Sequence, residues 1–235
     1  MLSRYAPSAV HEQYSYVDVL KEQLRPGMTW LDAGCGHNVI APWLRGATAT
    51  EAELLSRAAM VVGCDVDAVS LTKESAIRRV ACNLEQLAFA AESFDLISCN
   101  MVVEHLQQPE QVFQEFFRVL KPGGAVVIMT PNVLHWTMML SHLTPHWFHV
   151  FMRKKLFGSD EDDVFPTVYR ANTPAMLERK LKDAGFSGVD VRLLASVPHL
   201  VGMGPLLYFE FAVHRLTQRM PKFREILCAV ARKER

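Results

Sequence analysis

One acid and two glycines stand at the point where an apolar run gives way to a turn. The run at residues 28–33 ends in Gly34-Cys35-Gly36, and Asp32 lies two positions before the first glycine. Glycine lets the backbone approach a ligand closely, and a helix that starts there offers unpaired N–H groups. Because a carboxylate at Asp32 would repel a pyrophosphate, the turn favours a cationic or amino-bearing ligand.

A second acid, Asp65, ends another apolar run about thirty residues further on. A carboxylate at the end of the second strand of a parallel sheet can accept hydrogen bonds from both hydroxyls of a ribose. A helix cap is the alternative role for Asp65, and Asp67 suits that role equally well. The dinucleotide-binding fingerprint is incomplete, because Val39 stands where its third glycine belongs.

The elements that must position these residues are short apolar runs that alternate with helical patterns. A predicted helix at 110–120 has an apolar stripe and ends before Pro122-Gly123-Gly124. Another predicted helix has Thr173 as its cap and Pro174 at its first position. The alternation predicts an α/β fold with a doubly wound, mostly parallel sheet. The predicted strands are 28–33, 60–65, 79–83, 94–99, 125–130, 189–194 and 226–231.

Two longer segments interrupt the alternation, at about 131–172 and 195–223. Insertions at the carboxyl ends of strands in doubly wound sheets lie over the ligand crevice. We therefore interpret residues 1–235 as a single domain whose two insertions form a helical cap over an active site.

Several further blocks follow the glycine turn in order. They are Gly63-Cys64-Asp65, Asn83-Leu84-Glu85, Ser93-Phe94-Asp95, Glu104-His105-Leu106 and the block at 118–124. In order and spacing, residues 28–131 resemble the class I S-adenosylmethionine-dependent methyltransferases, in the broad group that includes the ubiquinone and menaquinone biosynthesis methyltransferases. The resemblance implies a Rossmann-like methyltransferase fold with a seven-stranded sheet whose last strand is antiparallel. It also implies S-adenosylmethionine as cofactor and S-adenosylhomocysteine as product.

The same resemblance implies which residues bind the cofactor. It puts Asp32 near the methionine amino group, Asp65 at the ribose, and Asn83 beside the adenine. Asn83 replaces the usual aspartate, but its carbonyl oxygen can still accept a hydrogen bond from the adenine amine. Asn100 would border the methionine part. The full implied set is Asp32, Gly34, Cys35, Gly36, Asp65, Val66, Asn83, Leu84 and Asn100.

Methyl transfer to a hydroxyl or to an acidic carbon needs a base, and histidine titrates near neutral pH. We predict His105 as the base, with His149 as a second candidate; the alternative for His105 is a hydrogen-bonded residue at a helix start. His142, His146 and His149 share one helix face only if the helix tolerates Pro145. No cysteine or acid joins them at ligand spacing, so no metal site is predicted. The other histidines considered as bases are His11 and His135.

Composition limits the partners and the compartment. The 25 basic residues balance 25 acidic ones, which gives no basic field for nucleic acid. Five cysteines in or beside apolar runs, without a C-x-x-C pair, predict free thiols in a reducing compartment. We see no secretory signal and no run long enough to span a membrane, and therefore expect a cytoplasmic protein.

Residues 199–224 carry apolar residues followed by basic ones. This order resembles a membrane-surface anchor, which would give weak peripheral contact with a membrane. A cap helix over an apolar acceptor pocket is the interpretation we favour, because the apolar block is short. The sequence leaves the oligomeric state open.

The function predicted from these features is S-adenosylmethionine-dependent methyl transfer to an oxygen or carbon of a small-molecule or lipid- or glycan-linked acceptor. His37-Asn38, where the family usually has threonine or serine and then glycine, motivates the alternative of a non-catalytic cofactor-binding or regulatory protein on the same scaffold. A nicotinamide-dependent oxidoreductase is a third hypothesis, and Asp32 together with the missing third glycine disfavours it.

Overall fold

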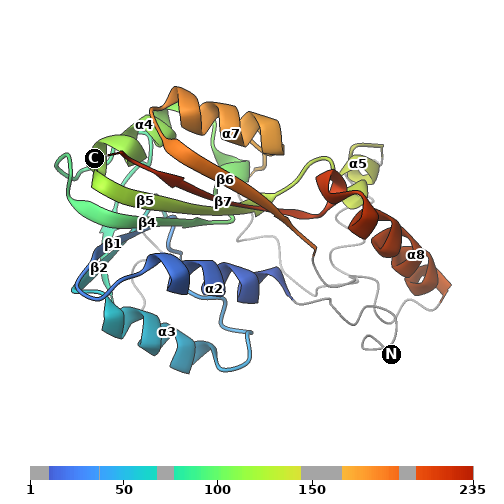
Figure 1. Cartoon of the computed structure of the whole chain (residues 1–235), viewed down its shortest axis with the longest axis horizontal. Helices are drawn as coiled ribbons and strands as arrows, with labels where there is room; N and C mark the ends of the chain where they lie inside the picture. Colours follow the sequence, from blue (N-terminus) through green and yellow to red (C-terminus); the bar gives the residue numbers. More distant parts are fainter. Residues whose placement is uncertain (1–10, 37, 68–76, 144–165, 196–204, 235) are drawn as a thin grey trace.

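The computed structural model describes residues 11–36, 38–67, 77–143, 166–195 and 205–234. They include a seven-stranded sheet with the strand order β3-β2-β1-β4-β5-β7-β6 (Figure 1). The order reverses between β1 and β4, which is where doubly wound sheets bind ligands. The strands are β1 (Thr29–Ala33), β2 (Met60–Asp65), β3 (Arg78–Ala81), β4 (Phe94–Asn100), β5 (Leu120–Pro131), β6 (Ser187–Leu194) and β7 (Ile226–Arg232).

Strands β1 to β5 pair in parallel, whereas β7 runs antiparallel to both β5 and β6. The predicted doubly wound, mostly parallel fold with seven strands is therefore confirmed. The interior strands are nearly continuous runs of buried residues, as expected for strands covered on both faces.

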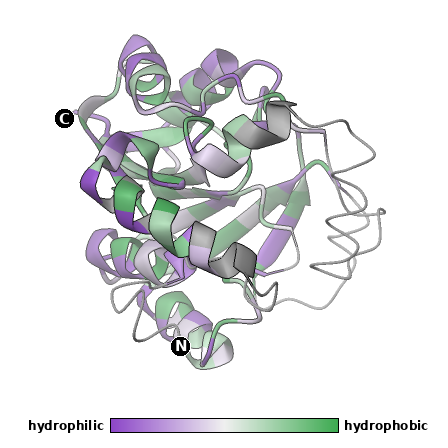
Figure 2. Ribbon diagram, turned by 90° about the vertical axis from the view of Figure 1, so that its right-hand side faces the viewer, coloured by the Kyte–Doolittle hydropathy of each residue, from purple (hydrophilic) through white to green (hydrophobic). Residues whose placement is uncertain are grey.

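Helices cover both faces of this sheet. On one face α4 (Pro109–Val119) and α7 (Pro174–Asp183) pack against residues such as Leu31 and Ile97. On the other face α2 (Glu12–Gln23) and α3 (Ala47–Arg57) pack around Trp30 and Leu96 (Figure 1). The helices carry hydrophilic and hydrophobic residues in alternating bands, as surface helices over a core do (Figure 2).

The predicted cap of α7 is confirmed, whereas the predicted start of the fifth strand is wrong. Thr173 caps α7, since its side chain accepts from the Met176 N–H, and Pro174 is the first helical residue. Helix α4 ends at Val119, but the chain then enters β5 directly at Leu120, so the expected start at 125 is wrong. The Pro-Gly-Gly segment lies within β5, at an irregularity where the pairing with β4 shifts register.

The predicted third strand also ends early, at Ala81 instead of residue 83. The Asn83 side chain accepts from the Glu85 N–H at 2.9 Å and turns the backbone out of the sheet. Asn83 therefore lies in the loop that follows β3.

Four helical elements border the carboxyl end of the parallel strands. The 3-10 helix η2 (Val103–His105) follows β4, and α5 (Trp136–Leu143) follows β5. Helix α8 (Pro205–Arg219) and the 3-10 helix η4 (Pro221–Phe223) precede β7, and α5 and α8 extend beyond the sheet (Figure 1). The rest of the two predicted insertions, 144–165 and 196–204, lies outside the described residues, so the cap stays a prediction.

All five cysteines are free, in agreement with the prediction, and Cys82 is the most exposed of them. Among the residues that the structure describes, no helix is both long and apolar enough to cross a membrane.

Candidate active site

A cavity of about 550 Å³ opens at the carboxyl ends of β1, β2 and β4. Seven of the predicted site residues line it, and they come from five different segments of the chain. They are Gly34, Asp65, Val66, Asn83, Leu84, Asn100 and His105. The other lining residues, Glu85, Met101, Val102, Leu106, Gln107 and Pro166, were not predicted.

The glycine turn after β1 is held by the neighbouring strand. The N–H groups of Gly34 and Cys35 both donate to the Cys64 carbonyl, at 2.8 and 3.1 Å. Gly34 has φ +74°, and a Cβ there would overlap the Val102 side chain across the cavity. Glycine is thus required at position 34 both by the backbone conformation of the turn and by the close contact with Val102. Cys35 is buried and does not line the cavity.

Asp65 connects the two turns at this edge. One carboxylate oxygen accepts from the Gly36 N–H at 2.9 Å, and the other accepts from the Asp67 N–H at 3.0 Å. Each oxygen retains a further lone pair for a hydroxyl donor. Asp65 lines the cavity beside the strongly exposed Val66, in the position expected for a ribose ligand.

Asp32 does not line the cavity. Its side chain is buried and accepts from the Ser98 hydroxyl at 2.5 Å, while that hydroxyl accepts from the Trp30 indole at 2.7 Å. Burial, with smaller contributions from the charges of Glu51 and Asp65, raises the pKa of Asp32 from 3.8 to about 7 against the opposing Ser98 hydrogen bond. The carboxyl lies below the glycine turn, and a cation at the turn would lower this pKa.

Asn83 and Leu84 form the wall beyond Asp65. The Asn83 carbonyl oxygen already accepts from the Glu85 N–H, and its second lone pair is available for an amine. The Leu84 side chain is 8% exposed and adds an apolar surface of the kind that packs against a nucleobase.

Asn100 is paired with a residue that the sequence did not indicate. Its amide donates to the Gln13 side-chain oxygen at 2.9 Å and accepts from the Gln13 amide at 3.2 Å. Gln13 lies in the first turn of α2, just after the capping residue His11. The amide pair therefore fastens the start of α2 to the cavity edge.

His105 lies on η2 with part of its ring exposed. Its Nδ1 is 3.1 Å from the Pro166 carbonyl oxygen, and because a carbonyl only accepts, Nδ1 donates. In the neutral ring Nε2 is then unprotonated, which is the form a general base requires. The predicted alternative is a hydrogen-bonded histidine at a helix start; the hydrogen bond is present, but His105 is the last residue of η2.

The buried Glu104 connects η2 to the end of β5 and to the chain at residues 168–172. Its carboxylate accepts from Thr130 Oγ1 at 2.9 Å, and the Asn172 amide donates to the same hydroxyl at 2.7 Å. Its backbone carbonyl accepts the N–H groups of Val168 and Tyr169. Burial raises the pKa of Glu104. Glu104 could have been singled out only through the block that it shares with His105.

The remaining predicted bases are elsewhere or outside the structure. His135 is buried with Nδ1 2.7 Å from Thr137 Oγ1, and it does not line the cavity. His149 and His146 lie outside the described residues, as do His37 and the side chain of His142. Within the described ranges no group of three or more histidine, cysteine or acidic side chains could hold a metal ion.

Comparison with known proteins agrees with this geometry. Residues 8–191 match the family described as a methyltransferase domain. A ubiquinone biosynthesis O-methyltransferase from Alkalilimnicola ehrlichii is 34% identical over 109 residues, 45% of this chain and 42% of that protein. The matched part of this chain thus spans less than half the length of that relative.

Two solved structures share the fold at low sequence identity. Geranyl diphosphate C-methyltransferase from Streptomyces coelicolor, in complex with Mg²⁺, geranyl diphosphate and S-adenosylhomocysteine, has a TM-score of 0.58 at 17% identity over 94% of this chain and 77% of that one. The [4+2]-cyclase SpnF has a TM-score of 0.56 at 16% identity over 94% of this chain and 81% of that one.

Proposed function

The chain belongs to the methyltransferase domain family, and from that premise we propose that it transfers the methyl group of S-adenosylmethionine to an oxygen of a small or lipid-linked acceptor. The observation that carries the proposal is the cavity that gathers Gly34, Asp65, Asn83 and Asn100 at the reversal of strand order. The O-methyltransferase names of the curated relatives favour oxygen over carbon as the nucleophile.

The residues present fit the cofactor. Asp65 would accept from the ribose hydroxyls, and Leu84 would cover one face of the adenine while Asn83 accepts from its amine. Gly34 lines the cavity beside Asp65, and its lack of a side chain leaves its backbone accessible to the methionine part of the cofactor. Glu51 and Asp65 lie close enough to Asp32 to raise its pKa, and a ligand that carries an ammonium and a sulfonium suits this group of acids.

When bound, S-adenosylmethionine supplies an electrophilic methyl group on a sulfonium. This chain would align the acceptor hydroxyl and remove its proton. His105 lines the cavity, and because its Nδ1 donates to the Pro166 carbonyl, its Nε2, which lies 4.0 Å from the Glu104 carboxylate, is the nitrogen that would accept the proton.

Calorimetric titration with S-adenosylmethionine and S-adenosylhomocysteine tests the proposal, and binding of neither would overturn it. Incubation with phenolic and polyprenyl-phenolic acceptors, read out by mass as methyl addition, then tests turnover. Binding of the cofactor without turnover of any acceptor would favour the non-catalytic alternative.

We further propose that α8 contacts a membrane and so brings a membrane-bound acceptor to the edge of the sheet where the cavity opens. Its exposed residues Tyr208, Ala212, Arg215, Leu216 and Arg219 recur at helical spacing and form one face. Over 205–224 the sequence has four basic residues and one acid, Glu210, which is buried. A face with apolar and cationic side chains suits an anionic lipid surface.

Co-sedimentation with phosphatidylglycerol vesicles, against phosphatidylcholine vesicles, measures this contact. The double substitution Arg215→Glu/Arg219→Glu should abolish binding, whereas Arg179→Glu on the exposed side of α7 should leave it unchanged. Equal loss in both variants would point to net charge alone and contradict a specific docking face.

A further inference from the structure

The loop at residues 82–93, which carries Asn83 and Leu84 to the cavity, is in neither helix nor strand. Local hydrogen bonds hold its two ends, since Asn83 accepts from the N–H groups of Glu85 and Gln86, and the Ser93 hydroxyl donates to the Ala90 carbonyl. The backbone between them needs partners from elsewhere, because buried carbonyl and N–H groups are rarely left unpaired.

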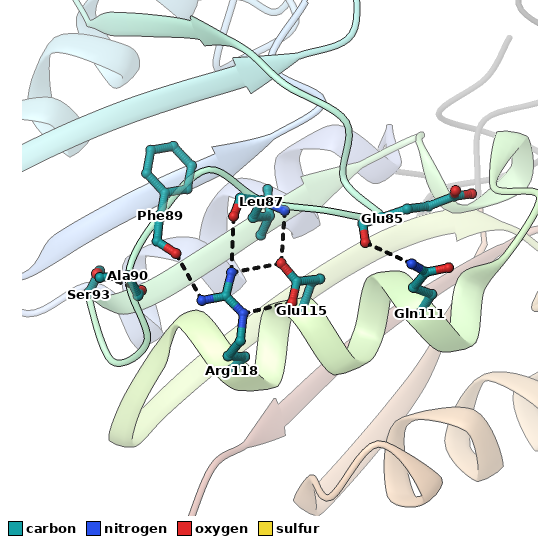
Figure 3. Close-up of polar contacts among 8 residues, drawn as sticks. All are labelled: Glu85, Leu87, Phe89, Ala90, Ser93, Gln111, Glu115 and Arg118. Atoms are coloured by element: carbon teal, nitrogen blue, oxygen red, sulfur yellow. Dashed lines mark hydrogen bonds and ion pairs between the residues drawn. The ribbon is translucent and has the colours of Figure 1, made fainter.

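Those partners come from one face of α4 (Figure 3). Gln111, Glu115 and Arg118 are spaced four and three residues apart, so their side chains leave the helix on the same side. They reach the carbonyls of alternate loop residues, as a neighbouring strand would: Gln111 donates to Glu85, and Arg118 donates to Leu87 and Phe89, at 2.9 to 3.1 Å.

Glu115 fixes the arginine and completes the contact. It accepts two hydrogen bonds from the Arg118 guanidinium, both at 2.7 Å, and its carboxylate also accepts from the Leu87 N–H at 2.8 Å. The Arg118 hydrogen bond holds the pKa of Glu115 below its usual range, so the pair is ionised at neutral pH. One guanidinium thus binds a carboxylate and two carbonyls in a single plane, an arrangement that a lysine ammonium cannot reproduce.

The loop also packs apolar side chains under this network. Leu84 and Leu87 are buried in the core beside α4, and the Phe89 ring meets Phe94 edge to face with centroids 5.0 Å apart. The apolar contacts hold the loop against the sheet, and the arginine network holds its backbone in register along α4.

We propose that Arg118 is a positioning residue for the nucleobase: through Glu115 and the carbonyls of Leu87 and Phe89 it places Asn83 and Leu84 where they contact the cofactor adenine. This inference rests on the proposed cofactor. Arg118 itself does not line the cavity, so any effect on binding acts through the loop.

The experiment compares Arg118→Met, Arg118→Lys and the matched control Lys182→Met in the full chain. Lys182 makes an exposed ion pair with Glu178 on α7, at 2.6 Å, and touches no loop of the cavity. Two quantities are measured: amide hydrogen exchange at Leu87, and the Kd for S-adenosylhomocysteine by calorimetry.

Both Arg118 variants should exchange the Leu87 amide faster and bind S-adenosylhomocysteine roughly tenfold more weakly, while Lys182→Met matches the wild type. In turnover the KM for S-adenosylmethionine should rise and the KM for the acceptor should stay unchanged. Restoration of wild-type affinity by Arg118→Lys would overturn the proposal, because charge alone would then suffice. If the wild type binds no cofactor, the proposed function fails; if it binds and both Arg118 variants bind equally well, only the positioning role fails.

Discussion

The neighbouring strands β1 and β2 both bring an aspartate to the same edge of the sheet, yet the two carboxyl groups have different surroundings. Asp32, one residue before the end of β1, is 4% exposed and accepts from the Ser98 hydroxyl. Asp65, the last residue of β2, is only partly buried and accepts from two backbone N–H groups. A difference of one residue in depth thus buries Asp32, and this burial raises its pKa to about 7.

The glycine that follows β1 should give the largest effect of substitution at this edge of the sheet. Gly34→Ala should destabilise the protein by about 3–5 kcal/mol, because the new Cβ adds strain at positive φ and overlaps Val102. Chemical denaturation measures the loss. A change below about 1 kcal/mol would show that the turn after β1 can rearrange without cost.

The buried acid should give the next largest effect. Since the folded pKa of Asp32 lies near 7 and the ordinary value is 3.8, the folded state retains a proton that the unfolded state has lost. Stability without ligand should therefore fall as the pH rises from about 4 to 7, by roughly 3 kcal/mol, and stay low above that range. Asp32→Asn should remove this dependence and be the more stable protein at pH 8, as measured by urea denaturation. Parallel pH profiles of variant and wild type would contradict the assignment.

The partly buried acid, Asp65, should instead affect ligand binding. Asp65→Ala should weaken binding of S-adenosylhomocysteine by about 1–3 kcal/mol, because charge-assisted hydrogen bonds to the ribose are lost. Asp67→Ala is the matched control, since it keeps the backbone N–H that Asp65 binds. Calorimetry that finds equal affinities for Asp65→Ala and the wild type would remove Asp65 from the site.

The smallest effect is expected at Gly63, in the middle of β2. An added Cβ there meets the Cys35 sulfur at 2.7 Å and the end of the Ile77 side chain at 2.9 Å, and the backbone conformation is ordinary. Gly63→Ala should cost about 1–2 kcal/mol in thermal or chemical unfolding, clearly less than Gly34→Ala. A loss of stability as large as that of Gly34→Ala would mean that steric overlap of the new Cβ, and not the positive φ of Gly34, accounts for most of the destabilisation at both positions.

The sequence was sufficient where the constraint is local. Glycines at positive φ, acids at strand ends and the Thr173-Pro174 cap can be recognised from residue type, and Gly34 and Asp65 of the cavity were predicted in this way. Asn83, Leu84 and Asn100 were predicted only through the family resemblance. The polar partners could not be found in this way. Gln13 and Asn100 are 87 positions apart, and Asn172 and Thr130 are 42 apart. Such pairs depend on how helices and loops cross in space, which no periodicity encodes.

The direction of β7 has a consequence for how the protein can change. Because β7 returns antiparallel between β5 and β6, β5 ends at Pro131 and β6 ends at Leu194 on the edge of the sheet where β7 begins at Ile226, and the cavity opens at this same edge. The segment between β5 and α7 and the segment between β6 and β7 can therefore be lengthened, shortened or exchanged while the buried strands keep their neighbours. On the proposed function, new acceptors would be sampled by altering these two segments alone, while the residues proposed to hold the methyl donor are retained.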